Sequence, residues 1–173
     1  MKSQIFLIGQ SSFWIKTIQT FGMEWVIYPA LLVVVNDTMA YVFGMLMGKN
    51  KLLPRLSPKK TVEGFIGGGV STCAIAVPLL KYFVNNVFAD GGKAAAVIGG
   101  GSGDIVKHAI MLGLYTSFIS PFGGFLASAV KRAHGAKDFG TLIPGHGGVV
   151  DRMDCQIVTA PFVFLYLTAC LAK

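Results

Sequence analysis

The sequence predicts an all-α, polytopic integral membrane protein with about four transmembrane helices joined by short basic loops. Hydrophobic residues make up 53% of its 173 residues and charged residues only 13%, about half of the charged fraction that is usual in a soluble domain. The mean hydropathy is +0.63. Four stretches are long and apolar enough for a membrane crossing, which takes about 20 helical residues. These observations exclude an ordinary soluble enzyme and a disordered chain.

The predicted spans cover about residues 25–48, 64–88, 109–130 and 155–172. The first span contains a single charge, Asp37, and the second is uncharged as far as Lys81, whose long side chain can reach the membrane surface. The third and fourth spans carry no formal charge. Residues 1–24 mix apolar and polar side chains and lack a signal-peptide cleavage pattern, which indicates an interfacial or partly inserted segment. Residues 25–173 then form a single transmembrane domain.

Basic residues gather in two loops, residues 49–63 and about 131–154, which hold nine of the fifteen Lys and Arg residues. With four crossings, both loops lie on the same side of the membrane, and the positive-inside rule assigns that side to the cytosol. The intervening loop, about residues 89–108, is rich in glycine and holds two lysines. In the first basic loop, Ser57 is expected to cap the second span and Pro58 to occupy its first helical position.

The densest cluster of reactive groups lies in the second basic loop, residues 128–154. Its cations suit phosphate groups; they are Lys131, Arg132, Lys137 and Arg152. Its carboxylates are hard oxygen ligands suited to Mg²⁺; they are Asp138, Asp151 and Asp154. Glycines before the last span allow backbone N–H groups to approach an anion; they are Gly145, Gly147 and Gly148. Together these groups indicate a metal-bridged polyphosphate.

Asp151 and Asp154 are spaced i, i+3, so both carboxylates share one face if the last helix begins near Val149. Taken singly, each of these residues has a simpler explanation. Lys131 and Arg132 end a span, where topology alone would put cations, and Asp151 could serve only as a helix cap. The whole set within 27 residues (128 to 154) favours a functional site.

This segment closely resembles the signature of the phosphatidate cytidylyltransferase family, the CDP-diacylglycerol synthases. The residues in register are Ser128, Lys131, Arg132, Lys137, Asp138, Pro144, His146, Gly147, Gly148, Asp151, Arg152 and Asp154. Residues 36–44 and 56–68 resemble the family as well, and the likeness covers about residues 25–170. Asn36-Asp37 and residues 120–125 are eukaryotic-like, whereas bacterial relatives usually have Gly-Asp at Gly123-Gly124. Because family members are considerably longer, we expect this chain to be a C-terminal fragment.

The resemblance implies a nucleotidyltransferase of phospholipid biosynthesis that converts CTP and phosphatidic acid into CDP-diacylglycerol and pyrophosphate. It implies the endoplasmic reticulum membrane as its location, with the active-site loops in the cytosol. The expected partners are CTP, phosphatidic acid and the bilayer; nucleic acid is not expected, and a homo-oligomer is left open. The expected cofactor is a divalent metal, Mg²⁺, at Asp151 and Asp154, with Asp138 either as a third ligand or as a group that hydrogen-bonds to the ligands.

On this interpretation the residues with a catalytic role are Lys131, Arg132, Asp138, Asp151 and Asp154. The residues expected to bind substrate phosphates are Ser57, Lys59, Lys60, Lys137, His146, Gly147, Gly148 and Arg152. Asp37 is a further candidate, because a carboxylate inside a membrane span is costly and is usually functional. A neutral Asp37 that bonds to neighbouring backbone is the alternative.

Two other functions remain open. A transporter or channel subunit would explain Asp37 but would leave the His-Gly-Gly and Asp-Arg-x-Asp patterns unused. Another CTP-using lipid enzyme, such as a polyprenol kinase, would release CDP in place of pyrophosphate.

Overall fold

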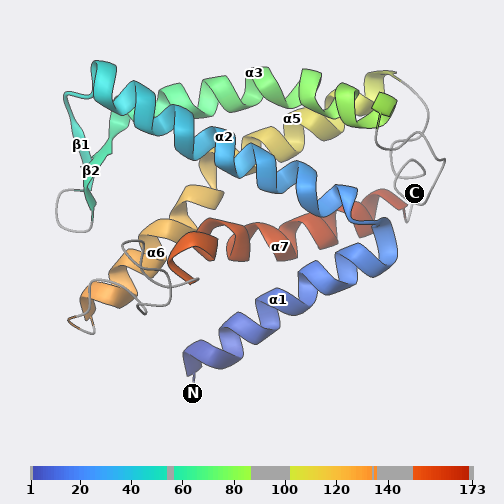
Figure 1. The fold of residues 1–173 in the computed structure, drawn as a ribbon, viewed down its shortest axis with the longest axis horizontal. Helices are drawn as coiled ribbons and strands as arrows, with labels where there is room; N and C mark the ends of the chain where they lie inside the picture. The colour runs from blue at the N-terminus through green and yellow to red at the C-terminus, as the bar shows by residue number, and fades with distance from the viewer. Residues whose placement is uncertain (1, 54–56, 87–101, 134, 136–149, 172–173) are drawn as a thin grey trace.

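The computed structural model describes the backbone of residues 2–53, 57–86, 102–133, 135 and 150–171, and the side chains of residues 11–52, 60–86, 103–133, 135 and 154–170. The described chain forms a bundle of helices with one two-stranded hairpin (Figure 1). In chain order the elements are α1 (Lys2–Phe21), α2 (Glu24–Met47), β1 (Lys51–Leu53), β2 (Ser57–Thr61), α3 (Val62–Asn86), α5 (Ser102–Phe118), α6 (Ser120–Ala133) and α7 (Val150–Leu171).

The described residues include three stretches long and apolar enough to cross a membrane: Glu24–Met47, Val62–Asn86 and Gly103–Ala133. Helix α7 adds a shorter apolar stretch, Asp154–Cys170. This pattern confirms the predicted all-α, polytopic architecture, and the protein is an integral membrane protein. Three of the predicted spans agree with α2, α3 and α7 to within a few residues, apart from the start of α7 at Val150.

The third predicted span is not one straight helix. Helix α5 begins at Ser102, seven residues before the predicted start, and ends at Phe118, after which α6 runs in a different direction (Figure 1). Pro121 explains the break, because it lacks an N–H and its ring would clash with the carbonyl group four residues earlier. The bonding changes here too: Ile119 N donates to Tyr115 O, whereas Phe122 N donates to Ile119 O, only three residues back.

The predicted cap at Ser57 is wrong. Ser57 and Pro58 lie in strand β2, and α3 begins only at Val62. Its cap is Thr61, whose Oγ1 accepts a hydrogen bond from the Gly64 N–H at 3.2 Å. The first basic loop is therefore a hairpin that feeds directly into α3.

The packed core lies in the half of the bundle that contains the start of α2 and the end of α7. Its fully buried side chains include Trp25, Tyr28, Leu80, Leu112 and Leu167, which come from four helices. Helix α1 packs along α7, and its Phe21 ring lies 6.0 Å from that of Phe164. An interfacial place for residues 1–24 stays a prediction. The opposite half of the bundle carries the cavity described next.

Candidate functional site

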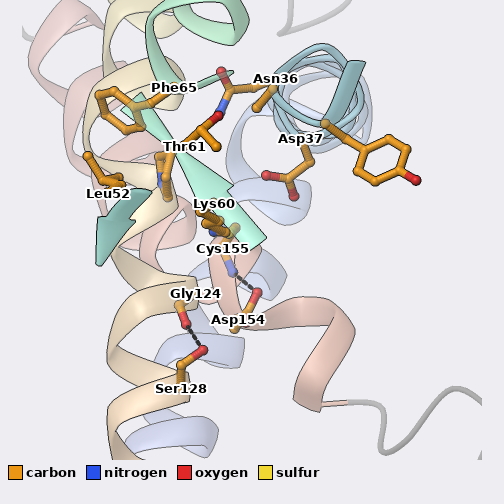
Figure 2. A pocket seen from close by; sticks show the side chains of 13 residues that line it. Asn36, Asp37, Leu52, Lys60, Thr61, Phe65, Gly124, Ser128, Asp154 and Cys155 are labelled. Atoms are coloured by element: carbon orange, nitrogen blue, oxygen red, sulfur yellow. Dashed lines mark hydrogen bonds between the residues drawn. The ribbon is translucent and has the colours of Figure 1, made fainter. Parts of the chain in front are cut away.

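A cavity of about 360 Å³ opens where the hairpin, the start of α7 and α6 meet (Figure 2). This volume is within the range of small-molecule sites. Six elements contribute to its wall: α2, β1, β2, α3, α6 and α7. The lining residues are Asn36, Asp37, Ala40, Tyr41, Leu52, Lys60, Thr61, Phe65, Pro121, Gly124, Ser128, Asp154 and Cys155. It therefore brings together segments from both basic regions of the sequence.

The irregular hairpin brings Lys60 to this cavity. Lys51 pairs with Thr61 and Leu53 pairs with Ser57, so three residues of β2 lie opposite the single residue Leu52. Such a bulge redirects side chains and is common beside functional sites. The Lys60 ammonium group lies 4.5 Å from the centre of the Phe125 ring, within cation–π range. The cation is thus held at the junction of the hairpin and α6 (Figure 2).

Asp154 faces the cavity from the first turns of α7. One carboxylate oxygen, Oδ1, accepts a hydrogen bond from the Cys155 N–H at 2.7 Å (Figure 2). The other, Oδ2, lies 3.5 Å from the point where a side chain on Gly124 would begin, and Lys60 Nζ lies at the same distance from that point. Cys155 Sγ also lies 3.5 Å from that point, so Gly124 lies beside a carboxylate, an ammonium group and a thiol at the cavity wall.

Asp37 joins the same cavity from the middle of α2, with Lys60 and Asp154 as its charged neighbours. Figure 2 shows its carboxylate directed toward the hairpin residues. Beside it, Asn36 is buried, and its Oδ1 accepts a hydrogen bond from Thr72 at 3.3 Å. The cavity therefore combines two carboxylates and one ammonium group, a set suited to a metal ion and to phosphate groups.

The other predicted site residues either lie away from the cavity lining or have side chains outside the described set. Lys131 and Arg132 lie in the last turn of α6, beyond the residues that line the cavity. Positive charges at this end of a helix also interact favourably with the helix dipole. The backbones of Ser57 and Lys59 lie in β2, and those of Asp151 and Arg152 lie in the first turn of α7, but their side chains are outside the described set. The predicted residues wholly outside the described ranges are Lys137, Asp138, Pro144, His146, Gly147 and Gly148.

Several lining residues had no predicted role from the sequence. Cys155 is free and buried, and it lines the cavity beside Asp154. Thr61 and Ser128 were noted as parts of the two motifs without a role of their own. Position within those motifs was the available signal for both residues. Phe65 and Tyr41 complete the wall, and nothing in their local sequence distinguishes them from lipid-facing aromatic residues.

A family model described as the cytidylyltransferase family matches residues 2–170. The chain belongs to the cytidylyltransferase family. Membership accounts for both motifs at once, because the match extends across Asp37, Lys60 and Asp154, the three charged residues that the fold gathers. The family resemblance predicted from the sequence is thereby confirmed.

Several similar curated proteins are phosphatidate cytidylyltransferases by name. The protein from Encephalitozoon cuniculi is 46% identical over 158 residues, covering 86% of this chain and 40% of the relative. Phosphatidate cytidylyltransferase 1 of Arabidopsis thaliana is 38% identical, covering 94% and 45%, and human phosphatidate cytidylyltransferase 2 is 39% identical, covering 86% and 40%. This member of the family therefore spans less than half of the length of these eukaryotic relatives.

Proposed function

We propose that this chain forms the active-site region of a phosphatidate cytidylyltransferase, which makes CDP-diacylglycerol from CTP and phosphatidic acid. One observation carries the proposal: in a chain of the cytidylyltransferase family, Asp37, Lys60 and Asp154 converge on one cavity from separate elements. The names of the similar proteins support the same reaction. The transporter alternative would leave this convergence of carboxylates and cation beside a family signature without a purpose.

The chemistry asks little of a general base. The phosphate monoester of phosphatidic acid is largely ionised at neutral pH, because its second pKa is near 6. One of its oxygens bonds to the α-phosphorus of CTP, the bond from that phosphorus to the bridging oxygen breaks, and pyrophosphate leaves with the electron pair. The task for the protein is to bring two anions together and to stabilise the charge on the leaving group.

Lys60 supplies fixed positive charge for that task. Its ammonium group stands beside the Phe125 ring and close to Gly124 at the cavity wall. Lys131 and Arg132 extend positive charge to the end of α6, where the phosphate groups of CTP or of the lipid can approach. The residues that we propose as further phosphate contacts are Ser57, Lys59, Lys137, His146, Gly147, Gly148 and Arg152.

Two described carboxylates are candidate ligands for a divalent cation. Asp37 and Asp154 present carboxylate oxygens to one cavity from α2 and α7, and Asp151 precedes Asp154 by one helical turn. Within the described side chains, no three His, Cys, Asp or Glu residues lie close enough to hold an ion, so Asp151 or Asp138 would complete the set. When bound, Mg²⁺ would supply the charge that joins two anionic substrates and stabilises pyrophosphate.

The proposed location is the endoplasmic reticulum membrane, with the cavity open to the cytosol. CTP is soluble and phosphatidic acid is a lipid, and a cavity at the end of the spans gives access to both. The basic residues at this end of the bundle favour the cytosolic side.

The decisive experiment incubates membranes that contain the full-length protein with radiolabelled CTP, phosphatidic acid and Mg²⁺. We expect labelled CDP-diacylglycerol and an equal amount of pyrophosphate, both abolished by a chelator and restored by Mg²⁺. Release of CDP with a phosphorylated lipid would establish a kinase and refute the proposal, and ion flux without a lipid product would support the transporter.

A further inference from the structure

A hydrogen-bonded clasp closes the base of the hairpin that carries Lys60. The N–H of Asn50 lies 3.2 Å from both carboxylate oxygens of Glu63, and the Asn50 side-chain amide donates to Glu63 Oε1 at 2.8 Å. In return, Asn50 O accepts a hydrogen bond from Val62 N at 2.9 Å. Three groups of Asn50 are therefore attached to the first two residues of α3.

The clasp joins the two strand ends that lie next to Lys60. Strand β1 begins directly after Asn50, and β2 ends directly before Val62. Because of the bulge, Lys60 is itself outside the paired positions of the two strands, so the ladder fixes it only through its neighbour Thr61. The attachment of Asn50 to Glu63 holds the two strand ends together at this point and limits how far Lys60 can swing.

We propose that Glu63 is a positioning residue that aims Lys60 into the cavity through Asn50. The proposal deepens the proposed function and rests on it in one respect, namely that Lys60 binds a substrate phosphate. Glu63 does not line the cavity and acts only through the hairpin.

A simpler role for Glu63 predicts a different result. Glu63 is an acidic residue in the first turn of α3. Its negative charge alone stabilises the helix by a favourable interaction with the helix dipole. The clasp instead requires acceptor oxygens, and a neutral carboxamide retains one. Glu63→Gln therefore separates the two roles: a dipole role is lost with the charge, whereas the clasp keeps bonds from Asn50.

The kinetic test uses membranes with the full-length protein and measures kcat and KM for CTP at saturating phosphatidic acid. We expect Glu63→Ala to lower kcat/KM about tenfold, a coupling typical of residues that act together. In a Lys60→Ala background the same change should cost less than about twofold. Glu63→Gln should keep at least about half of the parental value, because it keeps an acceptor. Equal losses in both backgrounds, or a loss in Glu63→Gln as large as in Glu63→Ala, would overturn the proposal.

A second measurement does not depend on turnover. In a Lys60→Cys variant, we expect a water-soluble maleimide to label the new thiol several-fold faster after Glu63→Ala, since the hairpin end is released. Lys51→Cys, which is exposed already, should label at an unchanged rate. An unchanged labelling rate of Lys60→Cys after Glu63→Ala would refute the role of the clasp. Faster labelling of Cys73, which lies within α3, would refute it as well, because it would indicate a general loosening of the fold. If the parent makes no CDP-diacylglycerol, the proposed function fails, yet these rates still decide whether Glu63 positions residue 60.

Discussion

At the scale of single residues, the two carboxylate oxygens of Asp154 have different surroundings. Oδ1 accepts the Cys155 N–H at 2.7 Å, and Oδ2 lies beside Gly124 at the cavity wall. An asparagine keeps an oxygen for the first contact but loses the charge for the second. Structural and functional effects of this residue can therefore be measured separately.

We expect Asp154→Asn to lower Mg²⁺-dependent CDP-diacylglycerol formation by at least about a hundredfold, the scale of electrostatic contacts to a transition state. Thermal stability in detergent should change little. Asp151→Asn should behave alike, and the double variant should lose less than the product of the two, because both act on one ion. Asp104→Asn is the control, since its exposed ion pair with Lys107 contributes little. Near-parental turnover in Asp154→Asn with Mg²⁺ dependence intact would refute the metal assignment.

Asp37 offers a second test at this scale. We expect Asp37→Asn to reduce activity at least about tenfold, because it removes one of two carboxylates at the cavity. Lys81→Gln should be close to parental, since Lys81 is exposed on α3 outside the cavity lining. Equal activities in the two variants would leave Asp37 as a neutral, structural acid.

From the sequence, Lys60 and Asp154 were assigned to one site on two loops of the same side, and Asp37 was only a further candidate. Asp37 was conspicuous because carboxylates are costly in membrane spans. Lys60 and Asp154 were conspicuous as parts of polar motifs in two separate loops. That they share a cavity depends on the bulge in β2 and on the direction of α6, which local patterns do not specify.

At the scale of elements, the approach of α6 to α7 depends on a glycine. A side chain on Gly123 would begin 2.6 Å from Asp154 O and 2.9 Å from Val158 Cγ2. On the adjacent Gly124, it would meet its nearest neighbours only at 3.5 Å. The pair therefore provides a matched comparison of close and ordinary packing.

We expect Gly123→Ala to destabilise the protein by about 1–3 kcal/mol, the usual cost of overpacking, and to reduce activity because Asp154 moves with the start of α7. Gly124→Ala should leave stability unchanged or raise it by up to about 1 kcal/mol, since alanine favours a helix. Thermal unfolding in detergent measures both. A similar loss of stability in both variants would contradict the close approach of α6 and α7 at Gly123.

Element boundaries were predicted well where hydropathy alone determines them and poorly where hydrogen bonding does. Pro121 was a visible signal for the break between α5 and α6, but Pro29, Pro78 and Pro161 lie inside unbroken helices. Likewise Ser57-Pro58 has the pattern of a helix start, yet its residues pair with β1. A proline or a Ser-Pro pair by itself therefore does not specify where a helix begins or ends.

At the scale of the whole molecule, the arrangement supports a single face for the site. The hairpin, the start of α7 and the cavity lie toward one end of the bundle, and the compact core lies toward the other (Figure 1). The predicted pairing of the two basic regions on one side agrees with Lys60 and Asp154 in one cavity. Which side of the membrane this is stays a prediction based on charge.

Labelling of introduced cysteines tests the whole arrangement. At about 1.5 Å per residue, the 25-residue helix α3 is longer than the roughly 30 Å hydrocarbon core, so its two ends should lie on opposite sides. In sealed vesicles with the cytosolic face outward, an impermeant maleimide should label Lys51→Cys and Ala133→Cys. It should label Asn86→Cys, at the far end of α3, only after permeabilisation, and mass spectrometry of the peptides separates each site from the native cysteines. Opposite protection of Lys51→Cys and Ala133→Cys would refute the shared site, because a cavity that draws on both the hairpin and α6 requires both segments at the same membrane surface.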